Sequence, residues 1–153
     1  MSSKIVTINS KVKALLATIA YAKDSGYADA DVSDLVQINK FPFYNVICEG
    51  YTVSNAGNIK MKHLERWTYS ILIQCAVQAM TLNVARVGDS TRKGIYKFTE
   101  DIRAALKSDT TLDGEVYGME IDSSIDIDVN STGRDTFIGA AEIRIKYYED
   151  EEA

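Results

Sequence analysis

Residue types that usually carry out catalysis or hold metal ions are scarce in this chain of 153 residues, which has one histidine, two cysteines and one proline. The histidine, His63, has no serine or cysteine that the sequence places beside it. Zinc sites need several Cys or His ligands at short spacing, and phosphate-binding loops need clustered glycines. Neither pattern occurs, so the sequence predicts no catalytic residue, no metal ion and no cofactor.

Long apolar runs are missing as well. Runs such as residues 71–73 end at Gln74, whereas a membrane-spanning helix needs about 20 apolar residues. The first residues also lack the apolar segment and small-residue cleavage site of a secretory signal. We therefore expect no membrane contact, a cytoplasmic location before assembly, and reduced thiols at Cys48 and Cys75, both in the core.

What the chain does have is enough apolar material for a core. Hydrophobic residues make up 46% and charged residues 25%, which is typical of one globular domain. We predict a single domain over residues 1–148 and a flexible acidic tail over 149–153.

Charge is unevenly distributed along the chain. Residues 113–153 hold 12 acidic and 3 basic side chains, whereas residues 1–112 hold 10 acidic and 14 basic. This polarity disfavours nucleic-acid binding by the acidic part and favours contacts between oppositely charged protein surfaces.

The apolar spacing predicts two amphipathic helices. Apolar residues recur every three or four positions over residues 8–23 and again over residues 91–107, so each segment has one apolar stripe. Asp89 or Ser90 is expected to cap the second helix.

Alternating apolar and polar residues predict four strands. Turns are expected at Gly50 and at residues 55–58 and 130–133, and residues 27–40 are predicted to be a connection. The predicted strands are residues 41–48, 67–77, 117–129 and 137–147.

The order of these elements (α-β-β-α-β-β) predicts an α+β fold, in which both helices pack on one face of a four-stranded antiparallel sheet. The expected core residues are Val12, Leu15, Leu16, Ile19, Trp67, Ile71, Ile73, Ile102, Leu106, Ile121, Ile127, Ile143 and Ile145.

Acidic residues alternate with apolar ones in the third predicted strand: Glu120, Asp122, Asp126 and Asp128. The segment from Asp126 to Asn130 has the oxygen side chains of a calcium loop, but it lacks the glycine and the final glutamate of such a loop. We therefore interpret the four acidic residues as the polar face of a strand and assign no metal to them.

Basic residues cluster in the second predicted helix and just before it: Arg86, Arg92, Lys93, Lys97 and Arg103. Proteins that bind single-stranded nucleic acid interleave such cations with aromatic residues, and here only Tyr96 is interleaved. We predict that Arg92, Lys93, Lys97 and Arg103 face an acidic protein surface, with phosphate as the alternative ligand.

Several features follow one another in an order that points to a known family. They are the opening amphipathic helix, Phe41-Pro42-Phe43 at the start of a strand, the long strand at 67–77, the helix at 94–106 and Leu112-Asp113-Gly114 before the final hairpin. Together, over most of the chain from Val12 to Tyr147, they resemble the tail terminator (tail-completion) proteins of long-tailed bacteriophages.

This resemblance implies a structural protein of the virion and not an enzyme. Such proteins close into a hexameric ring on the last ring of the tail tube, stop its polymerisation and later face the head connector. The implied partners are other copies of the chain, the tail tube protein and the head connector or stopper protein, at the head–tail junction. The alternatives are another phage head–tail connector or tail tube component, a small-ligand-binding domain, or an enzyme.

In such a ring, DNA would only pass through the channel. A negatively charged wall repels phosphates, whereas a basic wall binds them by counterion release. Glu120, Asp122, Asp126 and Asp128 are therefore candidates for the channel lining. The alternative is that they only keep an exposed strand face soluble.

Overall fold

The computed structural model describes residues 3–25, 41–59, 62–133 and 135–152, and it has an α+β fold with a single sheet and few helices. Residues 27–40, predicted to be a connection, lie outside the described residues. The helices are α1 (Lys4–Leu16), α3 (Leu82–Val87) and α4 (Ile95–Lys107). The strands are β1 (Lys23–Asp24), β2 (Phe43–Ile59), β3 (Lys62–Ala79), β4 (Gly118–Ile121), β5 (Asp126–Ser131) and β6 (Phe137–Glu152).

The sheet has six strands, so the prediction of a four-stranded antiparallel sheet is wrong. The order is β1-β2-β3-β6-β4, with β5 also paired to β6, and β1 runs parallel to β2. The predicted strand 117–129 is divided because Ile121 pairs with Ile145 while Asp126 pairs with Glu142. Residues 122–125 therefore oppose only two residues of β6, and this bulge separates β4 from β5.

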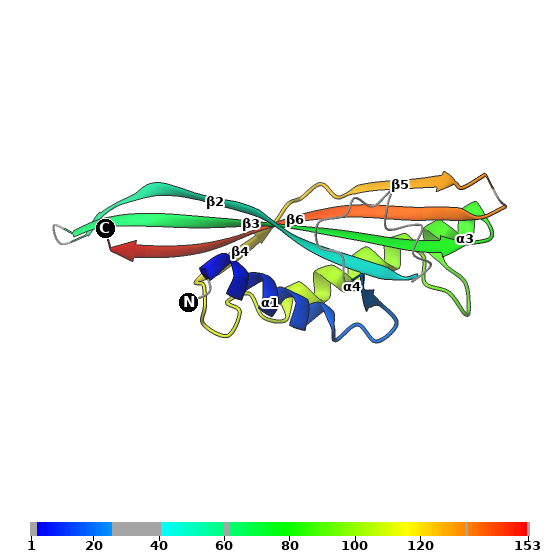
Figure 1. The fold of residues 1–153 in the computed structure, drawn as a ribbon, viewed down its shortest axis with the longest axis horizontal. Helices are drawn as coiled ribbons and strands as arrows, with labels where there is room; N and C mark the ends of the chain where they lie inside the picture. Colours follow the sequence, from blue (N-terminus) through cyan, green and yellow to red (C-terminus); the bar gives the residue numbers. More distant parts are fainter. Residues whose placement is uncertain (1–2, 26–40, 60–61, 134, 153) are drawn as a thin grey trace.

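Three strands are unusually long and extend past the helices. β2, β3 and β6 have 17, 18 and 16 residues, whereas strands usually have about 5–6. The turns predicted at Gly50 and at residues 55–58 are wrong, because the register shifts beside Gly50 and Gly57 are bulges within β2, with φ values of 112° and 107° that glycine tolerates. Figure 1 shows the result, a projection that we call the arm: residues 51–59, 62–69 and 147–152.

The acidic end of the chain belongs to this arm. The sequence predicts a flexible tail from residue 149, whereas in the structure residues 149–152 pair with residues 64–67 of β3. Backbone hydrogen bonds hold such a pair together, and charged side chains can point away from it.

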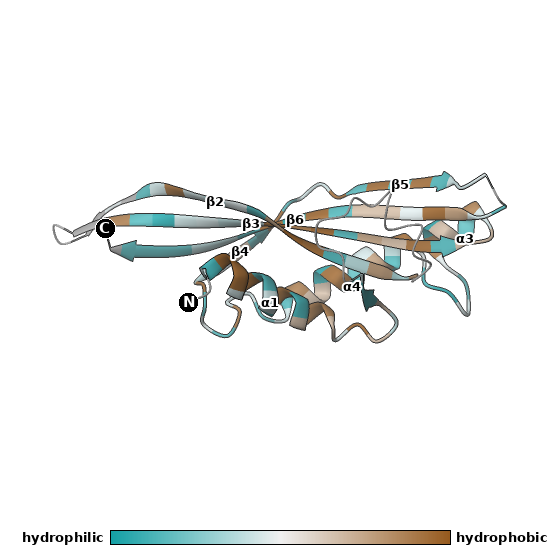
Figure 2. Ribbon diagram, viewed as in Figure 1, coloured by the Kyte–Doolittle hydropathy of each residue, from teal (hydrophilic) through white to brown (hydrophobic). Residues whose placement is uncertain are grey.

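The core lies between helices α1 and α4 and one face of the sheet, which we call the inner face (Figure 1). Figure 2 shows hydrophobic residues concentrated in the half of the sheet that the helices cover. Leu15, Trp67 and Ile121 are only partly buried, and Ile127 is 37% exposed because β5 lies at the sheet edge. The other expected core residues are buried: Val12, Leu16, Ile19, Ile71, Ile73, Ile102, Leu106, Ile143 and Ile145.

The helices differ from the prediction in their bounds and in the presence of α3. α1 ends at Leu16 instead of residue 23, because the chain turns there and the Ile19 N–H donates to the Leu16 carbonyl (3.0 Å). α3 was not predicted; the Thr81 side chain caps it by accepting from the Val84 N–H (3.2 Å). None of the helices that the structure describes is long and apolar enough to span a membrane.

The two cysteines lie in different environments. Cys75 is fully buried, and burial raises the pKa of its thiol to about 12. Cys48 is exposed, so its assignment to the core is wrong. It lies in β2 just before the arm, with its Sγ 3.9 Å from the carbonyl oxygen of Ile5 in the first turn of α1.

Candidate protein-binding surfaces

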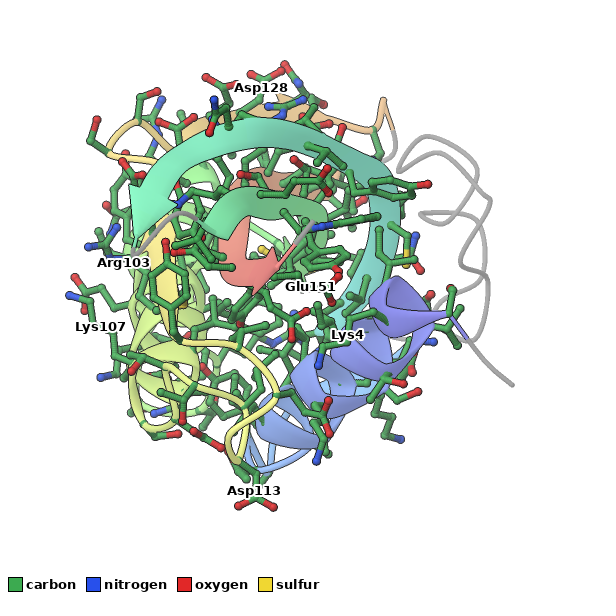
Figure 3. All side chains as sticks on the ribbon, turned by 90° about the vertical axis from the view of Figure 1, so that its left-hand side faces the viewer. Lys4, Arg103, Lys107, Asp113, Asp128 and Glu151 are labelled. Carbon is green, nitrogen blue, oxygen red and sulfur yellow. The ribbon has the colours of Figure 1, made fainter. Side chains whose placement is uncertain are left out.

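The four basic residues predicted to share one interface do not lie together. Arg92 and Lys93 belong to the loop between α3 and α4, and Lys97 lies in the first turn of α4. Arg103 follows Lys97 by six positions, which corresponds to about 240° around the helix and about 9 Å along it. Arg103 therefore points to a different side of α4 from Lys97, and it shares that side with Lys107 (Figure 3).

The loop between α3 and α4 is held by local hydrogen bonds. The Asp89 carboxylate accepts from the backbone N–H groups of Thr91 (2.9 Å) and Arg92 (2.7 Å), and these bonds lower the pKa of the Asp89 carboxyl. Asp89 therefore caps this turn, and the prediction that it caps α4 is wrong. The N-cap of α4 is Gly94.

Two glycines allow the ends of this loop to cross at close range. A Cβ at Gly94 would lie 2.4 Å from the Gly88 nitrogen and 2.5 Å from the Arg86 carbonyl oxygen. At Gly88, φ is 80° and a Cβ would lie 2.5 Å from the Arg92 carbonyl oxygen. Because all these neighbours are backbone atoms, only glycine fits at both positions without moving the loop that carries Arg92 and Lys93.

Replacing Gly94 with alanine is expected to displace this loop and to lower the free energy of unfolding by about 1–3 kcal/mol, the usual cost of overpacking. Gly118→Ala is the control, because no atom lies within 4 Å of a Cβ there. The control should change the free energy of unfolding by about 0.5 kcal/mol or less. Urea denaturation measures both, and equal stability of the two variants would contradict the close crossing.

A groove of about 430 Å³ lies beside the same loop. The Lys93 Nζ is 5.6 Å from the centroid of the Tyr21 ring, a cation–π contact. The Tyr21 hydroxyl donates to Asp101, and burial together with this carboxylate raises the pKa of Tyr21. The groove lining includes Tyr21, Phe41, Pro42, Val77, Arg92 and Lys93. Apolar walls and two cations suit an acidic protein segment with apolar side chains.

The acidic residues of β4 and β5 lie on the face of the sheet opposite to the helices, which we call the outer face. Glu120, Asp126 and Asp128 alternate in their strands with inner-face residues such as Ile121. Figure 3 shows Asp128 on the far side of the sheet from α1 and α4. Asp122, at the bulge, is exposed as well.

Basic residues of β6 interrupt this acidic surface. The guanidinium nitrogens of Arg144 lie 3.5 Å from a carboxylate oxygen of Glu142, 3.7 Å from one of Glu49 and 4.0 Å from one of Asp126. Arg144 therefore forms ion pairs with three carboxylates. Lys146 is paired in register with Glu120. The outer face is therefore acidic in balance, although it is not uniformly negative.

Part of the inner face of the arm leaves aromatic and apolar side chains exposed, although Tyr69 and Tyr147 at its base are buried in the core. Tyr51 is 56% exposed and Val53 is 43% exposed, with Trp67 half-buried beside them. The Tyr51 ring stacks on Trp67 with centroids 5.1 Å apart and lies 6.2 Å from the ring of Tyr69. The sequence prediction missed this surface because the strand predicted at residues 41–48 ended before Gly50. A bulge at Gly50 brings Tyr51 and Val53 opposite Tyr69 and Trp67.

Acidic side chains border this aromatic surface. Glu65 and Glu151 are directly opposite each other in the β3–β6 register, on the face that carries Trp67. Like charges in this position destabilise a strand pair. Burial and the nearby Glu149 and Glu151 raise the pKa of Tyr69 to about 12.

The two ends of the molecule differ in the chemistry of their described surfaces. One end of the molecule has cations beside an apolar groove, and the other has aromatic rings beside carboxylates.

Among the described residues, no three or more His, Cys, Asp or Glu side chains gather so that they could hold a metal ion. A comparison with protein-family models and with curated protein sequences finds no match to the chain.

Proposed function

We propose that this protein is a subunit of a hexameric ring that caps the tail tube of a long-tailed bacteriophage, stops its polymerisation and presents a surface for head-to-tail joining. The observation that carries the proposal is the arm, where Tyr51 and Val53 remain exposed on the inner face of the described subunit. Exposed apolar surface of this kind is typical of a protein contact site. The sequence features from Val12 to Tyr147 that resemble tail terminator proteins support the same kind of assembly.

The shape of the subunit also favours a ring. It is elongated, with the arm at one end and the α3–α4 loop at the other (Figure 1). When identical subunits join through unlike surfaces, they form a closed ring if the rotation between neighbours closes. Arg92 and Lys93 then serve contacts with a neighbouring copy, and Lys97 and Arg103 serve contacts with the tube protein or the head connector.

The outer face of the sheet is suited to the passage of DNA. Glu120, Asp122, Asp126 and Asp128 are all exposed on this side. As part of a channel wall, their negative charge keeps DNA phosphates from binding during ejection.

Assembly of tail tubes in vitro tests this function. Tube protein that polymerises from an initiating complex should stop elongating when this protein is added, and labelled protein should appear at one end of each tube. Labelling along the whole tube would instead indicate an ordinary tube component. Continued growth at saturating protein would contradict the capping function.

A further inference from the structure

We propose that the inner face of the arm of one copy receives the α3–α4 loop of the next copy, with Arg92 and Lys93 opposite Glu65 and Glu151. This inference rests on the proposed ring and names the two surfaces that meet in it. The occupant of the aromatic arm face is thus a second copy of this chain.

The inner face of the arm carries two carboxylates that lie opposite each other. Glu65 and Glu151 face each other across β3 and β6, and neither has a basic partner among the described residues. The neighbouring Glu149 differs, because the Lys4 Nζ lies 3.3 Å from its carboxylate. A cation from another molecule would therefore remove a repulsion that the isolated subunit retains.

The outer face of the arm provides the contrast. Arg66 and Asp150 are opposite each other in the same register and form an ion pair with Nε 3.0 Å from Oδ1. The Arg66 guanidinium also lies 5.6 Å from the centroid of the Tyr117 ring. Of the described charged residues, Arg66 and Asp150 on the outer face are thus paired within the subunit, whereas Glu65 and Glu151 on the inner face are not.

Two exposed basic side chains lie at the opposite end of the molecule from the arm. Arg92 and Lys93 are exposed, and neither forms an ion pair within 4 Å among the described residues, although the charge of Arg92 acts on the nearby Asp89 carboxylate. The Asp89 turn and the Gly88–Gly94 crossing fix the backbone that carries them. Holding a charged loop in place before binding reduces the entropy lost on association.

The arm and the surroundings of the α3–α4 loop both carry apolar side chains. The arm presents Tyr51, Val53 and Trp67, and the loop borders a groove with Phe41 and Pro42 in its wall. Contact between them buries aromatic side chains on both sides, which is where binding energy concentrates in protein interfaces. Because the two surfaces lie at opposite ends (Figure 1), one copy can use both at once with two neighbours.

The other basic residues of α4 are a poorer match. Lys97 is already 3.1 Å from Asp101. Arg103 lies one turn from Glu100 on the exposed side of α4, and a carboxylate at this spacing partly offsets its charge. Arg103 and Lys107 therefore provide a matched control for a change of charge at Arg92 and Lys93.

Reciprocal charge reversal tests the proposed contact. Self-association is measured by sedimentation velocity at high protein concentration and low ionic strength, because salt screens exposed charges. The arm variant Glu65→Lys/Glu151→Lys and the loop variant Arg92→Glu/Lys93→Glu should each remain folded by circular dichroism. Each should weaken association by about tenfold or more.

A variant with all four reversals should regain association to within a few-fold of the original protein. The control Arg103→Glu/Lys107→Glu should leave association unchanged. The contact would be ruled out by a fourfold variant no better than the weaker of its two parents, by a control as damaging as the loop variant, or by an original protein that stays monomeric.

The outcome also separates this contact from the proposed function. If charge restoration works but the protein does not stop tube growth, the contact is correct and the tail-capping function is wrong. If the protein caps tubes but the fourfold variant shows no recovery, the ring uses other surfaces.

Discussion

Replacing Ile71 with alanine is expected to lower the free energy of unfolding by about 2–5 kcal/mol. Ile71 is fully buried in β3, where it lies between Cys48 of β2 and Ile145 of β6 on the inner face. Removing the side chain leaves a cavity that the three paired backbones cannot close. Urea denaturation followed by circular dichroism gives the change in free energy.

Ile127→Ala is the control for this change. The same atoms are removed from a strand at the sheet edge, where Ile127 is 37% exposed. The free energy of unfolding should fall by about 1 kcal/mol or less, since little is lost from a partly exposed site. Equal losses in the two variants would show that β3 is not the centre of the core.

The second large effect concerns the outer face. Changing Asp122, Asp126 and Asp128 to lysine should leave the fold and the tail length intact, because all three side chains are exposed. Ejection of DNA from particles that carry the variant should slow sharply or stop, since a basic channel wall binds phosphates by counterion release. Ejection is measured as the rate of DNA release after the particle is triggered.

Two comparisons make this test specific. Raising the salt concentration should restore ejection in the lysine variant, because binding through phosphates weakens steeply with salt. Glu100→Lys, on the exposed side of α4, should have no effect. Normal ejection from the triple variant at low salt would show that these aspartates do not line the channel and serve only as a solvated strand face.

The sequence predicts the paired core of this fold better than its edges. Strict alternation in β3 and β6 and the apolar spacing of α4 identify Ile71, Ile73, Ile143 and Leu106 as buried, because a buried face leaves a strong periodic signal. The two-residue strand β1 and the short helix α3 leave no such signal, since each has too few residues to repeat a pattern. The bulge after Ile121 preserves the alternation on both sides, so a broken strand looks continuous in the sequence.

The candidate surfaces were predictable in part. The basic cluster was recognised by composition, but its separation into two sides follows from helix geometry once the start of α4 is fixed at Ile95. The arm was missed because glycine signals a turn and a β-bulge equally well, and Gly50 and Gly57 are bulges. The like-charged pair of Glu65 and Glu151 depends on strand register, which no local pattern specifies.

The number of copies in the assembly tests the central claim most directly. Native mass spectrometry of the protein, alone at high concentration and released from capped tail tubes, measures that number. The proposed hexameric ring predicts a mass of six subunits, and its head-to-tail contact predicts no stable twofold dimer, because the arm and the loop are unlike surfaces. A protein that remains monomeric in both conditions, or forms only a dimer, would contradict the account.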